Sequence, residues 1–188
     1  MSRLDDISYA DLSKEQKETF DKIVATRPLK PDDGHIGGPF DPWVRSPEMG
    51  RRLVGLGSFF RFNSSVERRY IEIAILVTGQ FWQAQFEWWA HEPMARDAGV
   101  PETLISAIKN SSTPQSDDPA DLAAYQLAYE IHHDRKLSDA TYTLAKSSFG
   151  ETGVAELIGL CGYYGIVSMT LNGFEVELPA GATEPFPA

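Results

Sequence analysis

A carboxylate and an imidazole stand four residues apart in the stretch Gln83-Ala-Gln-Phe-Glu-Trp-Trp-Ala-His91. On a helix, Glu87 and His91 share a face with their Cβ atoms roughly 5–6 Å apart, and Gln83 lies one turn further back on that face. Large aromatic side chains surround these polar groups. Burial and a neighbouring charge shift the pKa of both groups, so the pair could transfer protons. The alternative is an ion pair on a solvated helix face, but the aromatic surroundings favour a pocket.

A second carboxylate, Glu72, interrupts an otherwise apolar segment. The segment 66–79 is dense in β-branched residues, which suit a strand, but no partner strand is predicted anywhere in the chain. We therefore predict a buried central helix. A buried acid is costly unless it is paired or protonated, so Glu72 needs a partner. The simplest partner is Arg68 or Arg69 on the same helix, in a purely structural ion pair.

The remaining sequence predicts an all-α protein that forms a single domain over residues 1–188. Apolar periodicity and capping residues predict the other helices. Their expected ranges are 7–26, 46–60, 81–98, 101–109, 120–133, 138–149 and 152–171.

Two segments are predicted to lack helices. Residues 27–47 are rich in proline and glycine, which predicts a long ordered loop. Phe40 and Trp43 within it argue against disorder, so we expect this loop to cover a site. Residues 175–188 form an extended, apolar, proline-containing tail, of a kind that often packs on a neighbouring subunit.

Composition narrows the possible functions. The net charge of −10 disfavours a nucleic acid or an anionic membrane as partner. The single cysteine, Cys161, excludes an intrachain disulfide and a Cys-x-x-Cys site, and it is expected in the core. The adjacent His132 and His133 point in different directions on a helix, so we expect them at the surface and predict no metal site. No phosphate-binding loop indicates a cofactor. No apolar run of transmembrane length is expected, which predicts a cytoplasmic protein.

The chain resembles the carboxymuconolactone decarboxylase family, which shares the alkylhydroperoxidase D-like fold. The resemblance is carried by Glu72 followed by IAILVTGQFWQAQFEWWAH and MARDAGVPETLISAI, and by the segments GGPFDPWVRSPEMG and YYGIVSMTLNGFEVELP. It extends from about residue 35 to about residue 180. It implies a helical bundle that assembles as a homotrimer or homohexamer, with sites near subunit contacts.

Redox members of this superfamily carry a glutamate, a Cys-x-x-Cys pair and a histidine. Counted back from His91, the cysteine positions fall on Ala84 and Glu87, and the glutamate falls on Glu72. A disulfide-cycling peroxidase needs a thiolate and a resolving partner, so a thiol peroxidase is disfavoured. The decarboxylase branch instead has Glu and His at the spacing of Glu87 and His91.

The resemblance implies a cofactor-independent lyase that decarboxylates a small carboxylated lactone or related organic acid. His91 would protonate carbon, Glu87 would orient His91, and Glu72 would complete a proton relay. Arg69 matches a family arginine and would bind a substrate carboxylate, whereas the second family arginine is Ile71 here. Apolar walls are expected from Trp88, Tyr163, Phe40 and Trp43. Two alternatives stay open: a hydratase or isomerase with the same residues, and a non-catalytic oligomeric protein that binds a small molecule.

Overall fold

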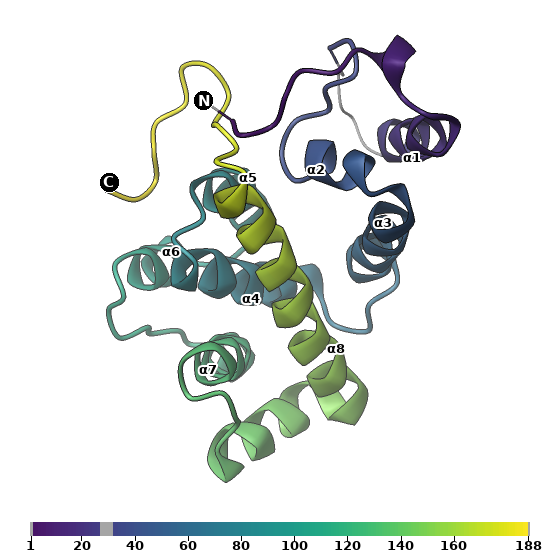
Figure 1. Ribbon diagram of the computed structural model, residues 1–188. Helices are drawn as coiled ribbons and strands as arrows, with labels where there is room; N and C mark the ends of the chain where they lie inside the picture. The colour runs from purple at the N-terminus through teal and green to yellow at the C-terminus, as the bar shows by residue number, and fades with distance from the viewer. Residues whose placement is uncertain (1, 27–31, 188) are drawn as a thin grey trace.

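The computed structural model describes residues 2–26 and 32–187 (Figure 1). Over these residues the chain is all-helical, as predicted, and its one β-bridge joins Asp32 to His35. A short 3₁₀ helix covers Tyr9–Asp11. The α-helices are α1 (Lys14–Ala25), α2 (Phe40–Arg45), α3 (Pro47–Phe62), α4 (Arg68–Phe81), α5 (Gln85–Asp97), α6 (Glu102–Lys109), α7 (Pro119–His133) and α8 (Asp139–Gly173).

Helix α4 is the central element. It packs against α5, α6, α7 and α8, while α1, α2 and α3 form a group to one side (Figure 1). Ile73, Ile75 and Leu76 of α4 have no exposed surface. Because every side of this segment faces other helices, its β-branched residues pack well within a helix despite their preference for strands.

Helix α1 begins later than predicted. A capping box defines its start: the Ser13 hydroxyl accepts from the backbone N–H of Gln16, and the Gln16 side chain accepts from the backbone N–H of Ser13 at 2.9 Å. The preceding residues form only the 3₁₀ turn, so the predicted helical start at residue 7 is wrong.

The predicted loop over residues 27–47 needs a correction. Residues 27–31 lie outside the described residues, and the remainder contains helix α2, which was not predicted. Pro42 is tolerated there because the first turn of a helix has no intrahelical partner for its N–H groups. Asp41 fixes the approach to α2 by accepting from the backbone N–H groups of Ile36 at 2.6 Å and Gly37 at 3.2 Å.

Helix α8 joins the two helices that were expected over 138–149 and 152–171. Gly150, with φ of 68°, bends the backbone between them. Contrary to expectation, α8 is long and apolar enough to cross a membrane by length and composition alone. Half of its most apolar stretch is buried inside the fold.

The end of α7 also differs from the prediction. His132 was expected at the surface, but it is half-buried and stacks on Phe81 at 4.9 Å. Its Nε2 lies 2.9 Å from the hydroxyl of Thr78. Burial lowers the pKa of His132 to about 4, so the ring is neutral at physiological pH.

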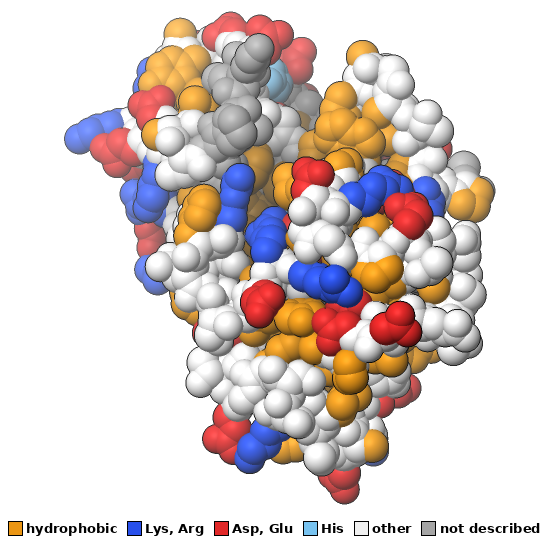
Figure 2. Space-filling model, turned by 180° about the vertical axis from the view of Figure 1, so that it is seen from behind, with side chains coloured by type: hydrophobic (Ala, Val, Ile, Leu, Met, Phe, Trp, Pro, Cys, Tyr) orange, Lys and Arg blue, Asp and Glu red, His pale blue; other side chains and the backbone are white. Residues whose placement is uncertain are grey.

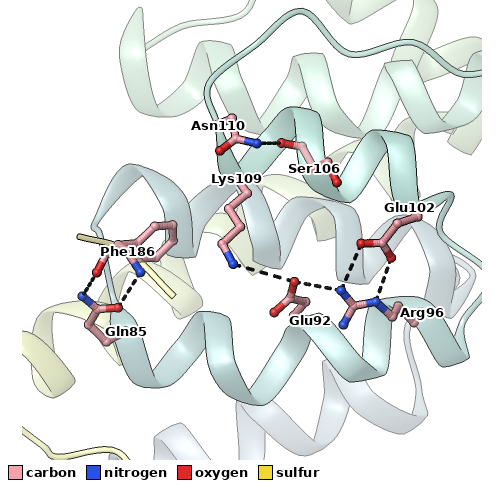
Figure 3. Close-up of polar contacts among 8 residues, drawn as sticks. All are labelled: Gln85, Glu92, Arg96, Glu102, Ser106, Lys109, Asn110 and Phe186. Atoms are coloured by element: carbon pink, nitrogen blue, oxygen red, sulfur yellow. Dashed lines mark hydrogen bonds and ion pairs between the residues drawn. The ribbon is translucent and has the colours of Figure 1, made fainter. Parts of the chain in front are cut away.

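The tail packs on its own chain. Phe186 is 4% exposed and its ring meets Trp88 of α5 edge-on at 5.2 Å. The Gln85 side chain binds both backbone groups of Phe186: it accepts from the N–H and donates to the carbonyl, each at 2.9 Å (Figure 3). Phe186 therefore anchors the tail to α5.

Candidate active site

His91 of α5 is held by Glu72 of α4. The imidazole Nδ1 lies 2.8 Å from Oε2 of Glu72, in a hydrogen bond between the two helices. Arg68, one turn earlier on α4, forms an ion pair with the other oxygen of Glu72. Glu72 is fully buried, so these two cationic partners offset the cost of its charge. The expected structural pair with Arg68 is present, but His91 joins it.

Glu87 approaches the other side of the same imidazole. Its Oε1 lies 3.1 Å from Nε2 of His91, but without hydrogen-bond alignment, so this buried oxygen has no hydrogen-bond partner. The i,i+4 spacing on α5 produces this contact, as the sequence indicated. Glu87 was expected to orient the imidazole ring. In the structure Glu72 does so instead, through its hydrogen bond with Nδ1.

Glu87 and His91 both have shifted pKa values. Burial raises the pKa of Glu87 to about 7; the charge of Glu72 adds to this increase, and His91 opposes it. Burial alone would lower the pKa of His91, but the negative charges of Glu72 and Glu87 outweigh it, so the pKa rises. Near neutral pH the carboxyl group of Glu87 is therefore close to half protonated, and the two carboxylates favour the protonated form of the neighbouring His91 ring.

A cavity of about 850 Å³ opens onto this pair. Glu87 and His91 line it, and so do three of the expected wall residues, Phe40, Trp43 and Tyr163. Its other walls include the N-terminal residues 2, 4 and 6 and the tail residues 176–179. Seen from behind, the surface is notched between the group of α1–α3 and the part that carries the tail (Figure 2).

Other aromatic side chains complete the lining. Phe86 and Trp89 were expected to surround the polar pair, and both line the cavity. Tyr164 of α8, which the sequence did not single out for the site, meets the His91 ring edge-on at 5.1 Å. Burial, with the charge of Glu87 next, raises the pKa of Tyr164 well above its usual value, so its phenol stays protonated.

Three expected site residues lie elsewhere. Arg69 does not reach the cavity, because its Nε donates to Asp121 of α7 at 2.7 Å. Trp88 is fully buried against Phe186 and does not line the cavity. Gln83 precedes α5, has a φ of 48°, and donates to the carbonyl of Gln80 at 2.7 Å. It does not share the Glu87 face because the helix begins two residues after it.

Arg68 and Arg61 line the cavity, although neither was predicted from the sequence to bind the substrate. Arg61 lies over the ring of Phe62 at 5.2 Å and has no carboxylate partner within the described residues. The sequence did contain a hint of the role of Arg68. Arg68 lies one turn before Glu72, so both residues share the face of α4 that meets α5.

Cys161 offers no thiolate to this site. It is fully buried on α8, and burial raises its pKa to about 12. Ala84 and Glu87 occupy the positions at which the redox members carry cysteines. A dithiol cycle therefore has neither nucleophile nor resolving thiol here.

No family model matches the sequence, and no curated protein sequence matches it. Among solved structures, the fold is similar to the crystal structure of an uncharacterized peroxidase-related protein from Silicibacter sp. TM1040. The TM-score is 0.72 at 12% identity, over 95% of this chain and 92% of that chain. At such low identity the likeness establishes the fold alone. The chain thus shares the helical fold of that protein.

Proposed function

We propose that this protein is a cofactor-independent lyase of the carboxymuconolactone decarboxylase type, acting on a small carboxylated lactone or a related organic acid. One observation carries the proposal: an imidazole fixed by Glu72 at Nδ1 meets Glu87 at Nε2, and both His91 and Glu87 face a large cavity. A fixed imidazole beside a carboxyl group with a pKa of about 7 suits proton transfer at neutral pH.

The reaction begins with cleavage of the bond between the substrate carbon and its carboxylate. CO₂ leaves, and the electron pair of that bond stays on the substrate, where a conjugated carbonyl spreads it as a dienolate. The positive charges of His91 and Arg68 at the cavity stabilise the developing anion. Nε2 of His91 then donates its proton to carbon. Glu87 returns a proton to Nε2 and regains one from water.

Arg61 and Arg68 provide the anion recognition that the sequence had assigned to Arg69. Arg68 is committed to Glu72, so it supplies charge near His91. Arg61 has no competing carboxylate among the described residues and is the better anchor for a substrate carboxylate. The aromatic walls hold the apolar part of the substrate.

The test follows CO₂ release from 4-carboxymuconolactone, related lactones and β-keto acids. We compare the wild type with His91→Ala, Glu87→Gln and a matched control, Glu92→Gln. Glu92 is on the same helix but pairs with Arg96 at 2.9 Å, away from the cavity (Figure 3). A positioned acid contributes about 10²–10⁴-fold in rate, so His91→Ala should lose most activity while Glu92→Gln retains it.

The other outcomes are informative. Full activity in His91→Ala would overturn the assignment. Conversion without CO₂ release, lost in the same variants, would replace the lyase by a hydratase or isomerase that uses the same residues. Binding of these compounds without any conversion would favour a non-catalytic binding protein.

A further inference from the structure

Decarboxylation at this site would leave the carbonyl oxygen of the intermediate without a hydrogen-bond donor. When CO₂ leaves, the electron pair moves onto the conjugated carbonyl, and negative charge collects on its oxygen. Such an oxyanion is stabilised most by a donor that is in place before the charge forms. Nε2 of His91 gives its proton to carbon, and Arg68 pairs with Glu72. Arg61 is the anchor for the substrate carboxylate, so a further donor is needed at the cavity.

Tyr164 of α8 provides a hydroxyl group close to His91. It lines the 850 Å³ cavity, and its ring meets the ring of His91 edge-on, with the centroids 5.1 Å apart. Burial raises the pKa of the phenol, and the nearby charges of Glu87 and Glu72 raise it further. The phenol therefore keeps its proton at neutral pH and can donate a hydrogen bond beside the group that transfers the proton.

The hydroxyl of Tyr164 has no hydrogen-bond partner in the part of the chain that the structure describes, yet its oxygen keeps accessible surface. The hydroxyl of a tyrosine inside a protein usually does find a partner. The nearest comparable groups are not available: the hydroxyl of Ser2 donates to the carbonyl of Phe174 at 3.3 Å. The indole N–H of Trp43 also lacks a partner, but it is buried out of reach of a ligand. Tyr164 thus has an unused donor that a ligand in the cavity can meet.

Ring contacts hold Tyr164 in place. Its neighbour Tyr163 meets it edge-on, with the centroids 5.1 Å apart. Tyr163 is 5% exposed and packs on Phe60 at 5.8 Å, so this contact is anchored in the core. The second contact is the ring of His91, which Glu72 fixes through Nδ1. A donor held in this way needs no reorganisation when charge develops on a substrate oxygen.

We propose that Tyr164 is a further catalytic residue, whose O–H donates a hydrogen bond to the substrate carbonyl oxygen that becomes the oxyanion of the dienolate. The phenol keeps its own proton throughout. The electron pair of the broken carbon–carboxylate bond moves toward that oxygen, CO₂ leaves, and carbon takes its proton from Nε2 of His91. This inference rests on the proposed function and narrows its substrate class: the carbonyl must be conjugated with the carbon that loses CO₂, as in a β-keto acid or an unsaturated lactone.

Kinetics of Tyr164→Phe test the proposal. The variant keeps the ring and, because the hydroxyl has no partner among the described residues, its removal leaves no protein group unsatisfied. The kcat for CO₂ release should fall about 10²–10³-fold, as when one oxyanion donor is removed, with KM changed less than about twofold. The control Tyr142→Phe alters an exposed tyrosine of α8 outside the cavity and should keep full activity. An unchanged kcat in Tyr164→Phe would overturn the proposal and leave the lyase in place.

Binding of 3,4-dinitrophenolate tests the donor without any turnover. This probe carries an oxyanion conjugated with its ring, and the matched neutral probe, 1,2-dinitrobenzene, has the same ring without the oxygen. The pH is held slightly below the pKa of Glu87, about 7, so that most of its carboxyl groups are protonated and do not repel the anion. Tyr164→Phe should bind the phenolate about 10–100-fold more weakly than the wild type does, because a hydrogen bond to a charged oxygen is lost. Binding of dinitrobenzene should be unchanged.

The two experiments separate the role of Tyr164 from the lyase activity itself. If the wild type released no CO₂ from any compound but Tyr164→Phe still lost phenolate binding, the lyase would be wrong and the oxyanion site of Tyr164 would be supported. If the wild type bound both probes equally, or if Tyr164→Phe bound the phenolate as tightly as the wild type, the proposal would be overturned whatever the kinetics show.

Discussion

Two adjacent arginines of α4, Arg68 and Arg69, each pair with a buried carboxylate, but in different surroundings. Arg69 makes a two-pronged contact with Asp121, and the hydroxyl of Ser116 donates to the same carboxylate at 2.6 Å. Arg68 pairs with Glu72, whose second oxygen binds His91. The first cluster lies outside the 850 Å³ cavity, whereas the second leads to it through His91 and Glu87.

The two clusters differ in whether their buried carboxylate oxygens have hydrogen-bond partners. Both oxygens of Asp121 accept hydrogen bonds, so this cluster has the features of a structural network. Oε1 of Glu87 is buried without a hydrogen-bond partner. An unsatisfied buried oxygen destabilises the fold, and such groups cluster where a protein performs chemistry. This contrast favours a functional role for the Glu72–His91–Glu87 cluster over a purely structural one.

The largest expected effect on stability is at the satisfied cluster. Asp121→Asn removes the charge that Arg69 binds, and breaking a buried ion pair costs roughly 3 kcal/mol. In a chain of this size that lowers Tm by about 6–12 °C. Thermal unfolding measures the loss, with the exposed Asp117→Asn as control. Activity per folded molecule should be unchanged; a large loss of activity would erase the contrast between the two clusters.

Glu87→Gln should change stability in the opposite direction. The folded pKa of Glu87, about 7, is raised from the usual 4.5, so its contribution to stability is complete below about pH 4.5 and is lost as pH rises through 7. The neutral variant avoids this loss. Above pH 7 it should be more stable than the wild type by roughly 3 kcal/mol, and the difference should vanish near pH 4. Urea unfolding at both pH values measures this. A destabilised Glu87→Gln protein at about pH 8 would contradict the raised pKa.

The pH–rate profile tests the proposed roles within the Glu72–His91–Glu87 cluster. If Glu87 returns the proton to His91, the rate of the wild type should fall as pH rises through about 7. In Glu87→Gln the remaining activity should depend on His91 alone. Removing the charge of Glu87 also removes part of what raises the pKa of His91. A wild-type rate that stays constant through this range would exclude Glu87 as the proton source.

The sequence predicted the Glu72–His91–Glu87 cluster better than its surroundings. The spacing of Glu87 and His91 determines their contact on any helix, and the resemblance added Glu72 from α4. The choice between Arg68 and Arg69 could not be made in the same way. Adjacent residues on a helix point about 100° apart, and only the packing of α4 against α5 and α7 decides which one faces the cavity.

Packing and helix boundaries, which the sequence does not fix, also explain why Trp88 and Gln83 lie outside the cavity. Trp88 was expected beside Glu87, but its position on α5 turns it toward the tail. Gln83 was expected on the Glu87 face because the helix was predicted to begin at residue 81, four residues before α5 begins at Gln85. The homotrimer or homohexamer and the cytoplasmic location stay predictions.

The smallest effect is expected at Phe186, where the tail is anchored to α5. This change tests whether the 850 Å³ cavity depends on the tail of the same chain. Phe186→Ala removes the ring that packs on Trp88, and residues 176–179 of the same tail line the cavity. Because the tail can detach rather than leave a void, we expect less destabilisation than the roughly 3–5 kcal/mol of a core Phe→Ala change. KM should rise about three- to tenfold with little change in kcat, since a looser wall weakens substrate binding but leaves the Glu72–His91–Glu87 geometry in place. Steady-state kinetics beside the exposed control Pro187→Ala measure both constants. If kcat fell while KM stayed constant, the tail would instead position Glu87 through Trp88.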